Sequence, residues 1–287
     1  MYKALINTLA VCSFIIITHA QAAMPKSQIW LAQDSERGFS VQPLTDKDAY
    51  HNQPLITEVG VYYTKEVKAQ KQSQTDLFLY RFDNKSHTNL TNTPESEYSP
   101  TIFPHKKGIS TIVVEQSGEQ RLWFYPEDKS QLPSRIFEHI KPVGYHAWGK
   151  NEDVILFILG DPHSLQFTNL SGHLPKVVAK DIGRSLAYNS ARDIYSFTFL
   201  VDGEQWFATY SSSTGSVKKQ FRLPKSVRDY TWFDESTLAY AIDNKIFMRN
   251  IDAPKSVKLW RNLQDYCDTD ITRLSYYDRT LAFVCEQ

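Results

Sequence analysis

A short hydrophobic pattern recurs six times along the chain at nearly constant spacing. Each copy contains a run that is rich in Val, Ile, Phe and Tyr and apolar on both faces, which is typical of a β-strand covered on both sides. The six runs are Val59–Thr64, Ile109–Val114, Asp153–Leu159, Ile194–Val201, Thr237–Ile242 and Thr280–Val284. No convincing 3.6-residue periodicity accompanies them, so we expect an all-β protein.

A further apolar segment follows five of these runs, and a sixth lies near the start of the chain. We expect these six segments to be the third strands of their sheets: Leu77–Phe82, Leu122–Tyr125, Leu165–Thr168, Trp206–Tyr210, Ile246–Met248 and Ile29–Ala32. In five copies the second position is a large aromatic residue, namely Phe78, Trp123, Phe207, Phe247 or Trp30, and the remaining copy has Gln166. Such a repeated register predicts a packing site that recurs from sheet to sheet.

Another short strand precedes each of the six runs. These first strands recur at intervals of 40 to 47 residues, near Gln53, Ser99, His146, Leu186, Thr231 and Thr272. Turn residues such as Asp83-Asn84 and Ser171-Gly172 separate the units. Four strands in about 40 to 50 residues is the size of one propeller blade, so the chain predicts a six-bladed β-propeller.

The two ends of the chain supply complementary halves of one sheet. Ile271–Glu286 provides only two strands, and Gln28–Thr45 provides two others that have no partners before them. We therefore expect a two-plus-two closure, in which the N-terminal strands complete the C-terminal blade. Such a closure hides strand edges that would otherwise promote aggregation.

The first 22 residues are typical of a cleaved export signal. Lys3 precedes the apolar run Ala4–Thr18, and Ala20-Gln21-Ala22 has the small-x-small pattern of a cleavage site. We expect residues 23–287 to form a single propeller domain that is periplasmic or secreted. No later stretch reaches the roughly 20 apolar residues of a membrane span. The 32 basic and 32 acidic residues include no dense basic block, which argues against a nucleic-acid partner.

Two cysteines, Cys267 and Cys285, flank the first two strands of the closing blade. A hairpin near Tyr277–Arg279 would bring them together, and an oxidising compartment favours a disulfide. The bridge would close a loop of 18 residues and stabilise the fold by about 3 kcal/mol in the chain-entropy model. Two reduced, half-buried thiols are the alternative.

Two segments resemble the repeats of the TolB-type propellers. These are Tyr50–Glu66, YHNQPLITEVGVYYTKE, and Asn92–Val114, NTPESEYSPTIFPHKKGISTIVV, whose SPTIFPHKKG run stands where the repeat has a Ser-Pro-Asp-Gly turn before an apolar strand. Later units, such as Trp148–Asn151, depart from this motif. The resemblance implies a periplasmic docking propeller without the N-terminal α/β domain of TolB. Prolyl oligopeptidases carry similar propellers, but this sequence has no G-x-S-x-G nucleophile turn.

Loops that lead into the first strands converge on one mouth of the central channel, where binding residues tend to gather. The candidate ligand-binding residues at this mouth are His51, Gln53, Glu97, Tyr98, Tyr145, His146, Arg184, Ser185, Asp229, Tyr230, Asp270, Thr272 and Arg273. Arg184 and Arg273 present planar forks suited to carboxylates. The ring therefore predicts a site for an anionic or polar small molecule or a peptide end, and a merely water-filled channel is the alternative.

Three of these residues, His51, Glu97 and His146, are also suitable ligands for a divalent metal. Their spacing of 46 and then 49 residues places them on three successive blades at comparable depth. A metal at this position would support a lyase or hydrolase in the channel mouth.

The sequence favours an exported, non-catalytic recognition or scaffolding propeller of the bacterial cell envelope. We expect a monomer that needs no cofactor and binds an envelope protein or a polar small molecule. A metal-assisted lyase or hydrolase is one alternative, and a propeller subunit that works with a separate catalytic protein is another.

Overall fold

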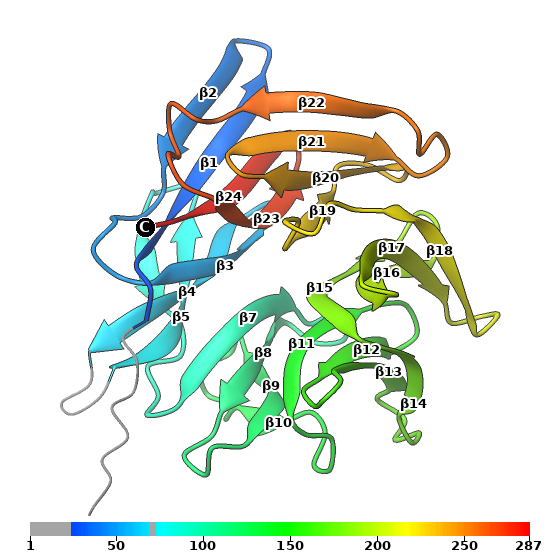
Figure 1. Cartoon of the computed structure of the whole chain (residues 1–287). Coiled ribbons are helices and arrows are strands. Elements are labelled where there is room, and N and C mark those ends of the chain that lie inside the picture. The colour runs from blue at the N-terminus through cyan, green and yellow to red at the C-terminus, as the bar shows by residue number, and fades with distance from the viewer. Residues whose placement is uncertain (1–23, 69–72) are drawn as a thin grey trace, which may run out of the picture.

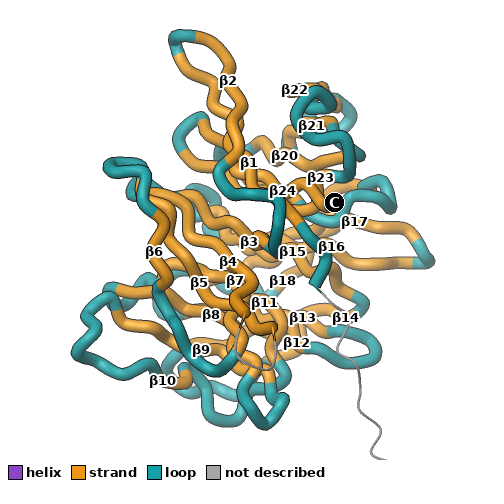
Figure 2. The backbone as a smooth tube through the Cα atoms, turned by 90° about the vertical axis from the view of Figure 1, so that its left-hand side faces the viewer, coloured by secondary structure: helices purple, strands orange, loops and turns teal. Residues whose placement is uncertain are grey.

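The computed structural model describes residues 24–68 and 73–287, which form strands and loops without a helix (Figure 1, Figure 2). Six antiparallel sheets of four strands surround a central axis, which confirms the all-β, six-bladed propeller. The predicted export signal, residues 1–22, lies outside the described residues. No helix capable of crossing a membrane occurs in the part of the chain that is described.

The first two strands of each blade lie nearest the axis (Figure 1). The first strands are β3 (His51–Ile56), β7 (Ser96–Ile102), β11 (Val143–Trp148), β15 (Ile182–Asn189), β19 (Tyr230–Trp232) and β23 (Ile271–Tyr277). The second strands are β4 (Gly60–Lys68), β8 (Gly108–Val114), β12 (Asp153–Ile158), β16 (Ile194–Val201), β20 (Thr237–Ile242) and β24 (Thr280–Glu286). These second strands are the apolar runs of the sequence pattern, and burial on both faces explains their composition.

The other two strands of each blade lie toward the periphery. The third strands are β5 (Ser73–Arg81), β9 (Gln120–Pro126), β13 (Ser164–Asn169), β17 (Glu204–Ser211), β21 (Lys245–Asn250) and β1 (Ser27–Ser35). The outermost strands are β6 (His87–Asn89), β10 (Ser134–Arg135), β14 (Lys176–Lys180), β18 (Ser216–Arg222), β22 (Val257–Asn262) and β2 (Gly38–Pro43). We number the blades 1 to 6, starting with β3–β6 as blade 1 and ending with β23, β24, β1 and β2 as blade 6.

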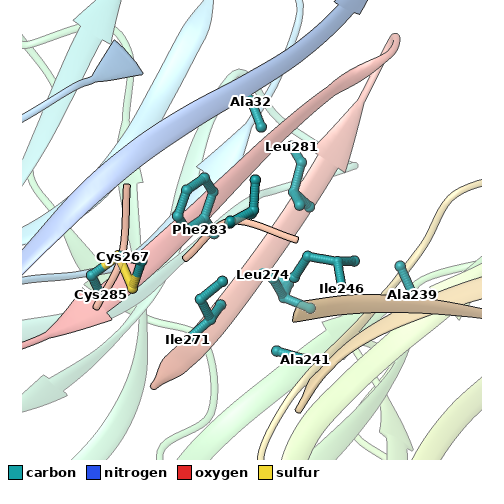
Figure 3. Close-up of a cluster of buried hydrophobic side chains, with 11 residues drawn as sticks. Ala32, Ala239, Ala241, Ile246, Cys267, Ile271, Leu274, Leu281, Phe283 and Cys285 are labelled. Carbon is teal, nitrogen blue, oxygen red and sulfur yellow. A yellow bond between two sulfur atoms is a disulfide. The ribbon is translucent and has the colours of Figure 1, made fainter. Parts of the chain in front are cut away.

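The ring closes as the sequence predicts, because strands from both ends of the chain share blade 6. β1 pairs with β24, with Trp30 directly opposite Phe283. A disulfide joins Cys267 to Cys285, with 5.8 Å between their Cα atoms, and confirms the expected pairing (Figure 3). The wholly buried Phe283 lies in the hydrophobic cluster beside this bridge, so the closing blade is held by strand pairing, a covalent bond and apolar burial together.

The aromatic register of the third strands differs from the prediction in one copy. A register shift follows Leu165, Phe207 and Ile246 in their respective blades, so these three residues occupy equivalent positions, and each is wholly buried. Phe207 therefore belongs to the first position of the repeat and not to the second. Trp206 points to the other face, where Lys219 lies over its ring at 5.0 Å. Successive strand residues point to opposite faces, so the burial of Phe207 leaves Trp206 on the partly exposed face.

Candidate functional site

The first strands of the six blades line an axial cavity of about 570 Å³. A smaller cavity, of about 270 Å³, lies where these strands begin, and it is lined by Tyr50, Asn52 and Tyr98 together with Glu286 and the segment 24–25. Two residues, Arg184 and Arg273, line both cavities. The two guanidinium groups therefore lie between the cavities, at the floor of the larger one.

β-bulges create this lining. The ladder between the first and second strands shifts register in five blades, between Asn52 and Leu55, Tyr98 and Thr101, Val143 and Tyr145, Ile182 and Leu186, and Ile271 and Arg273. A bulge turns side chains out of their regular alternation and releases backbone groups from the ladder. Pro54 and Pro100 lie at two of these bulges, where a residue without an N–H is tolerated.

Side-chain hydrogen bonds support the bulges of blades 1 and 2. Gln53 and Ser99 both have left-handed backbone conformations, with φ of 53° and 56°. The Oε1 atom of Gln53 accepts hydrogen bonds from the Ser99 backbone N–H at 2.9 Å and from Thr64 Oγ1 at 2.9 Å. Gln53 thus connects the two blades at the rim of the larger cavity.

The two arginines are held by neutral acceptors. Arg273 is 8% exposed, and its Nη2 donates to the hydroxyl of Tyr145 at 2.9 Å. Arg184 Nη2 donates to the backbone oxygen of Thr272 at 3.1 Å, and its buried Nε has no partner among the described residues. Neither guanidinium forms an ion pair within residues 24–68 and 73–287.

Asp229 provides the negative charge of the same floor. Its Oδ1 accepts hydrogen bonds from Ser185 Oγ at 2.5 Å and from the backbone N–H of Tyr230 at 2.9 Å, and its Oδ2 accepts from the backbone N–H of Leu274 at 3.3 Å. These three donors hold the carboxylate in place. It acts on both arginines through space and forms no direct ion pair with either of them.

Burial and neighbouring charges shift the pKa values of the groups at the floor. Burial and the neighbouring positive charge of Arg273 lower the pKa of Arg184 below its usual range. Burial by itself would lower the pKa of Arg273. The nearby Tyr145, Asp229 and Tyr50 have a larger opposite effect, so the pKa of Arg273 is raised. Burial raises the pKa of Tyr50, so its phenol stays neutral. Both arginines stay protonated, because a guanidinium does not lose its proton in proteins.

Most of the predicted ring residues meet at the axis. Those that line the larger cavity are Gln53, Tyr145, His146, Arg184, Ser185, Asp229, Tyr230 and Arg273, and Tyr98 lines the smaller one. His51, Glu97, Asp270 and Thr272 line neither of these two cavities. Asp270 is exposed, and Thr272 contributes only its backbone oxygen to Arg184.

His51, Glu97 and His146, the three predicted metal ligands, do not converge. His51 Nδ1 lies 3.3 Å from the Ser27 backbone oxygen of blade 6, and His146 Nε2 lies 2.7 Å from Ser110 Oγ of blade 2. Glu97 faces the boundary between blades 1 and 2. No group of three His, Cys, Asp or Glu side chains suited to a metal ion occurs in the described part of the chain.

Hydroxyl groups surround the buried Glu97 carboxyl. Thr91 Oγ1 donates to its Oε2 at 3.1 Å, and Thr93 Oγ1 and Tyr125 Oη donate to its Oε1, the latter at 2.9 Å. The wholly buried Asp76 lies nearby on β5 and further raises the Glu97 pKa. These contacts stabilise the packing of blade 2 on blade 1 and do not include the two arginines.

Sequence reasoning missed two features of the site. Tyr50 faces the arginines from the position just before β3. The aromatic residue that begins the Tyr50–Glu66 segment could have indicated this position. The larger cavity lies over the later residues of the first strands, such as Thr101 and Tyr188, although the prediction emphasised their beginnings. The bulges caused this difference, because they redirect side chains within the strands.

Comparisons with known proteins identify the fold. No protein-family model and no curated protein matches the sequence. Among solved structures, the chain is similar to a putative TolB from Agrobacterium tumefaciens, with a TM-score of 0.69 and 10% identity, covering 92% of this chain and 99% of that chain. It is also similar to TolB from Acinetobacter baumannii, with a TM-score of 0.55 and 12% identity over 83% and 79% of the two chains.

A third similar structure is the β-propeller domain of the Trilobed protease from Pyrococcus furiosus, which has an open velcro topology. Its TM-score is 0.53 at 14% identity, with 80% of this chain and 76% of that chain covered. At such identities the similarity shows the fold alone. The fold is that of the TolB-type propellers, as the two motif segments predicted.

Proposed function

We propose that this chain is an exported, non-catalytic binding propeller of the bacterial cell envelope, which holds an anionic ligand or an acidic part of a protein partner in its axial cavity. One observation carries the proposal: the buried Arg273 and the half-buried Arg184 lie together at the cavity floor, and neither has an ion-pair partner among the described residues. Buried charges are costly unless they are compensated. A bound anion would supply that compensation.

Three further observations agree with this function. The cavity volume of about 570 Å³ lies in the range of ligand-binding pockets. The Cys267–Cys285 bridge is consistent with an oxidising compartment outside the cytoplasm. The apolar segment Ala4–Thr18 with its small-x-small site supports export.

Anion titration tests the binding proposal directly. The wild-type protein and an Arg184→Met/Arg273→Met variant would be titrated with succinate, benzoate, inorganic phosphate and polyglutamate, with melting temperature as the readout. We expect at least one anion to raise the melting temperature of the wild type, because a ligand that binds only the folded state stabilises it. The double variant should lose this response. No response in the wild type, or an equal response in both proteins, would contradict the proposal.

Export has a separate test. Expression of the full chain in a Gram-negative host, followed by N-terminal sequencing of the protein from the periplasmic fraction, should give a chain that begins near Ala23. A full-length chain confined to the cytoplasm would contradict this part of the proposal.

A further inference from the structure

The floor of the axial cavity carries one uncompensated positive charge. Arg184 and Arg273 contribute two positive charges and Asp229 one negative charge. Glu286, which lines the smaller cavity, also acts on Arg184 through space, but the positive charge of Arg228 balances it, since Arg228 Nη1 lies 3.6 Å from Glu286 Oε2. A singly charged anion would therefore neutralise the floor. A phosphate monoester, with a charge of about −1.5 to −2, would leave excess negative charge in a buried site.

Unused donors at the floor fit a carboxylate. Arg184 Nε is buried and has no acceptor among the described residues. The Tyr145 hydroxyl accepts a hydrogen bond from Arg273, so its own hydrogen remains available for another acceptor. A carboxylate has two oxygens with about four acceptor sites, and guanidinium groups recognise it with two parallel hydrogen bonds.

The residues that line the larger cavity include both apolar and polar groups. Leu55, Ile102 and Leu274 provide apolar surface, and Ser99 contributes a buried hydroxyl without a partner among the described residues. This combination fits a peptide better than a plain hydrocarbon chain, because a peptide carries side chains and hydrogen-bonding amides alternately along its length. The charged floor would hold its terminal carboxylate.

We infer that the larger axial cavity binds the free C-terminus of a peptide with apolar side chains, whose α-carboxylate lies between Arg184 and Arg273. The inference rests on the proposed anion-binding function and specifies its ligand. Recognition of a chain end would restrict the partners to proteins or peptides with an accessible C-terminus. Internal acidic segments would bind weakly, because their backbone cannot bring a terminal carboxylate to the floor.

Calorimetric titration with two peptides that differ only at the last group tests the inference. N-acetyl-Gly-Ala-Leu-Leu with a free carboxylate and the same peptide with a C-terminal amide would be titrated into the wild-type protein. We expect the amide to bind at least tenfold more weakly. Equal binding of the two peptides would overturn the inference, and tighter binding of decanoate than of the free acid would assign the site to fatty acids instead.

Charge-removing variants locate the interaction. Arg184→Met and Arg273→Met should each weaken binding of the free acid by at least tenfold while leaving the weak binding of the amide unchanged. Arg37→Met, on the exposed β1–β2 turn, is the matched control and should bind like the wild type. Loss of binding in Arg37→Met, or full binding in both axial variants, would place the peptide elsewhere and overturn the inference.

The outcomes separate this inference from the proposed function. If succinate or phosphate binds in an arginine-dependent manner and the free peptide does not, the C-terminus inference fails and anion binding stands. If no anion and no peptide binds the wild type, both fail.

Discussion

Blade 2 packs against its two neighbours through buried groups of opposite chemistry. Toward blade 1 the group is the carboxyl of Glu97, surrounded by hydroxyls and close to Asp76, and we call this contact the acidic seam. Toward blade 3 the group is the imidazole of His146, next to Ser110 and Trp148, and we call this contact the histidine seam. Both groups are almost completely shielded from water, yet the consequences for the protein's response to pH are opposite.

Burial favours the neutral form of each group. It raises the pKa of Glu97 from 4.5 to about 7 and lowers that of His146 from 6.5 to about 3. By linkage, the stability from Glu97 is complete below pH 4.5 and is lost as pH rises through about 7. The stability from His146 is complete above pH 6.5 and is lost as pH falls toward 3. One cause, the removal of water, therefore has opposite effects on an acid and a base.

The largest expected effect belongs to the histidine seam. His146→Gln keeps a neutral side chain near Ser110 that does not titrate. The wild type should lose about 5 kcal/mol of its free energy of unfolding relative to this variant between pH 6.5 and 3, because its pKa shift spans that window. Urea unfolding followed by tryptophan fluorescence across this range measures the difference. His105→Gln, on an exposed loop, is the control, and parallel stability curves for His146→Gln and wild type would contradict the prediction.

The acidic seam should give the next largest effect, with the reverse sign. Glu97→Gln removes the titration, so the wild type should lose about 3 kcal/mol relative to this variant as pH rises from 4.5 to 7. Between pH 4.5 and 6.5 the two seams oppose each other in the wild type, and only the single variants expose each slope. The same unfolding experiment applies, with the exposed Glu58→Gln as control. A difference that stays constant with pH would show that Glu97 does not titrate in this range.

A third contact between blades consists of hydrogen bonds alone, so its contribution to stability should not depend on pH. Ser196 Oγ accepts from the Trp232 indole at 3.0 Å and from the Tyr230 hydroxyl at 2.9 Å, just as Ser110 Oγ accepts from the Trp148 indole at 2.8 Å. Ser196→Ala leaves the buried Tyr230 hydroxyl and the half-buried Trp232 indole without this acceptor.

Ser196→Ala should therefore cost about 2 kcal/mol in the free energy of unfolding, equally at pH 5 and pH 8, since the tyrosine and the indole stay neutral. Urea unfolding at both values measures this loss. The exposed Ser190→Ala should change neither value. A loss that varies with pH would mean that this contact titrates as well.

The smallest effect concerns one hydroxyl of the acidic seam. Tyr125→Phe removes the 2.9 Å hydrogen bond to Glu97, which should cost about 1 kcal/mol in the free energy of unfolding at pH 8. The cost should shrink at pH 4.5, because an ionised carboxylate gains more from a donor than a protonated one. Unfolding at the two pH values, compared with the exposed Tyr277→Phe, provides the measurement. An equal cost at both would contradict the assignment of Glu97 as the titrating group.

The local pattern predicted the repeating parts of the fold well and the site only in part. Strand positions and ring closure followed from short apolar runs, and Trp30 pairs with Phe283 as that closure requires. The alignment of Phe207 was wrong by one position, because the register shift that aligns it with Leu165 depends on pairing with a neighbouring strand. A single-residue shift exchanges the two faces of a strand.

Only some of the predicted ring residues line the axial cavity, because the direction of each side chain also depends on strand pairing. Arg184 and Arg273, 89 residues apart in sequence, meet at the axis because bulges in β15 and β23 turn them there. Glu97 and His51 hold equivalent places in the sequence pattern, but their side chains face the neighbouring blades, Glu97 toward Asp76 and Thr91 and His51 toward Ser27. Spacing along the chain specifies the blade of a residue and leaves the direction of its side chain open.

The sequence by itself determined the number of blades, their order and the two-plus-two closure, and it favoured the cysteine pair. These features depend on strand-length hydrophobic periodicity and on which segments lack partners, and both are local properties of the chain. Only the tertiary structure decided which polar groups share the axial cavity and which lie buried between blades. That choice depends on bulges and on packing between sheets, since contacts between residues far apart in sequence set the direction of each side chain and its exposure to water.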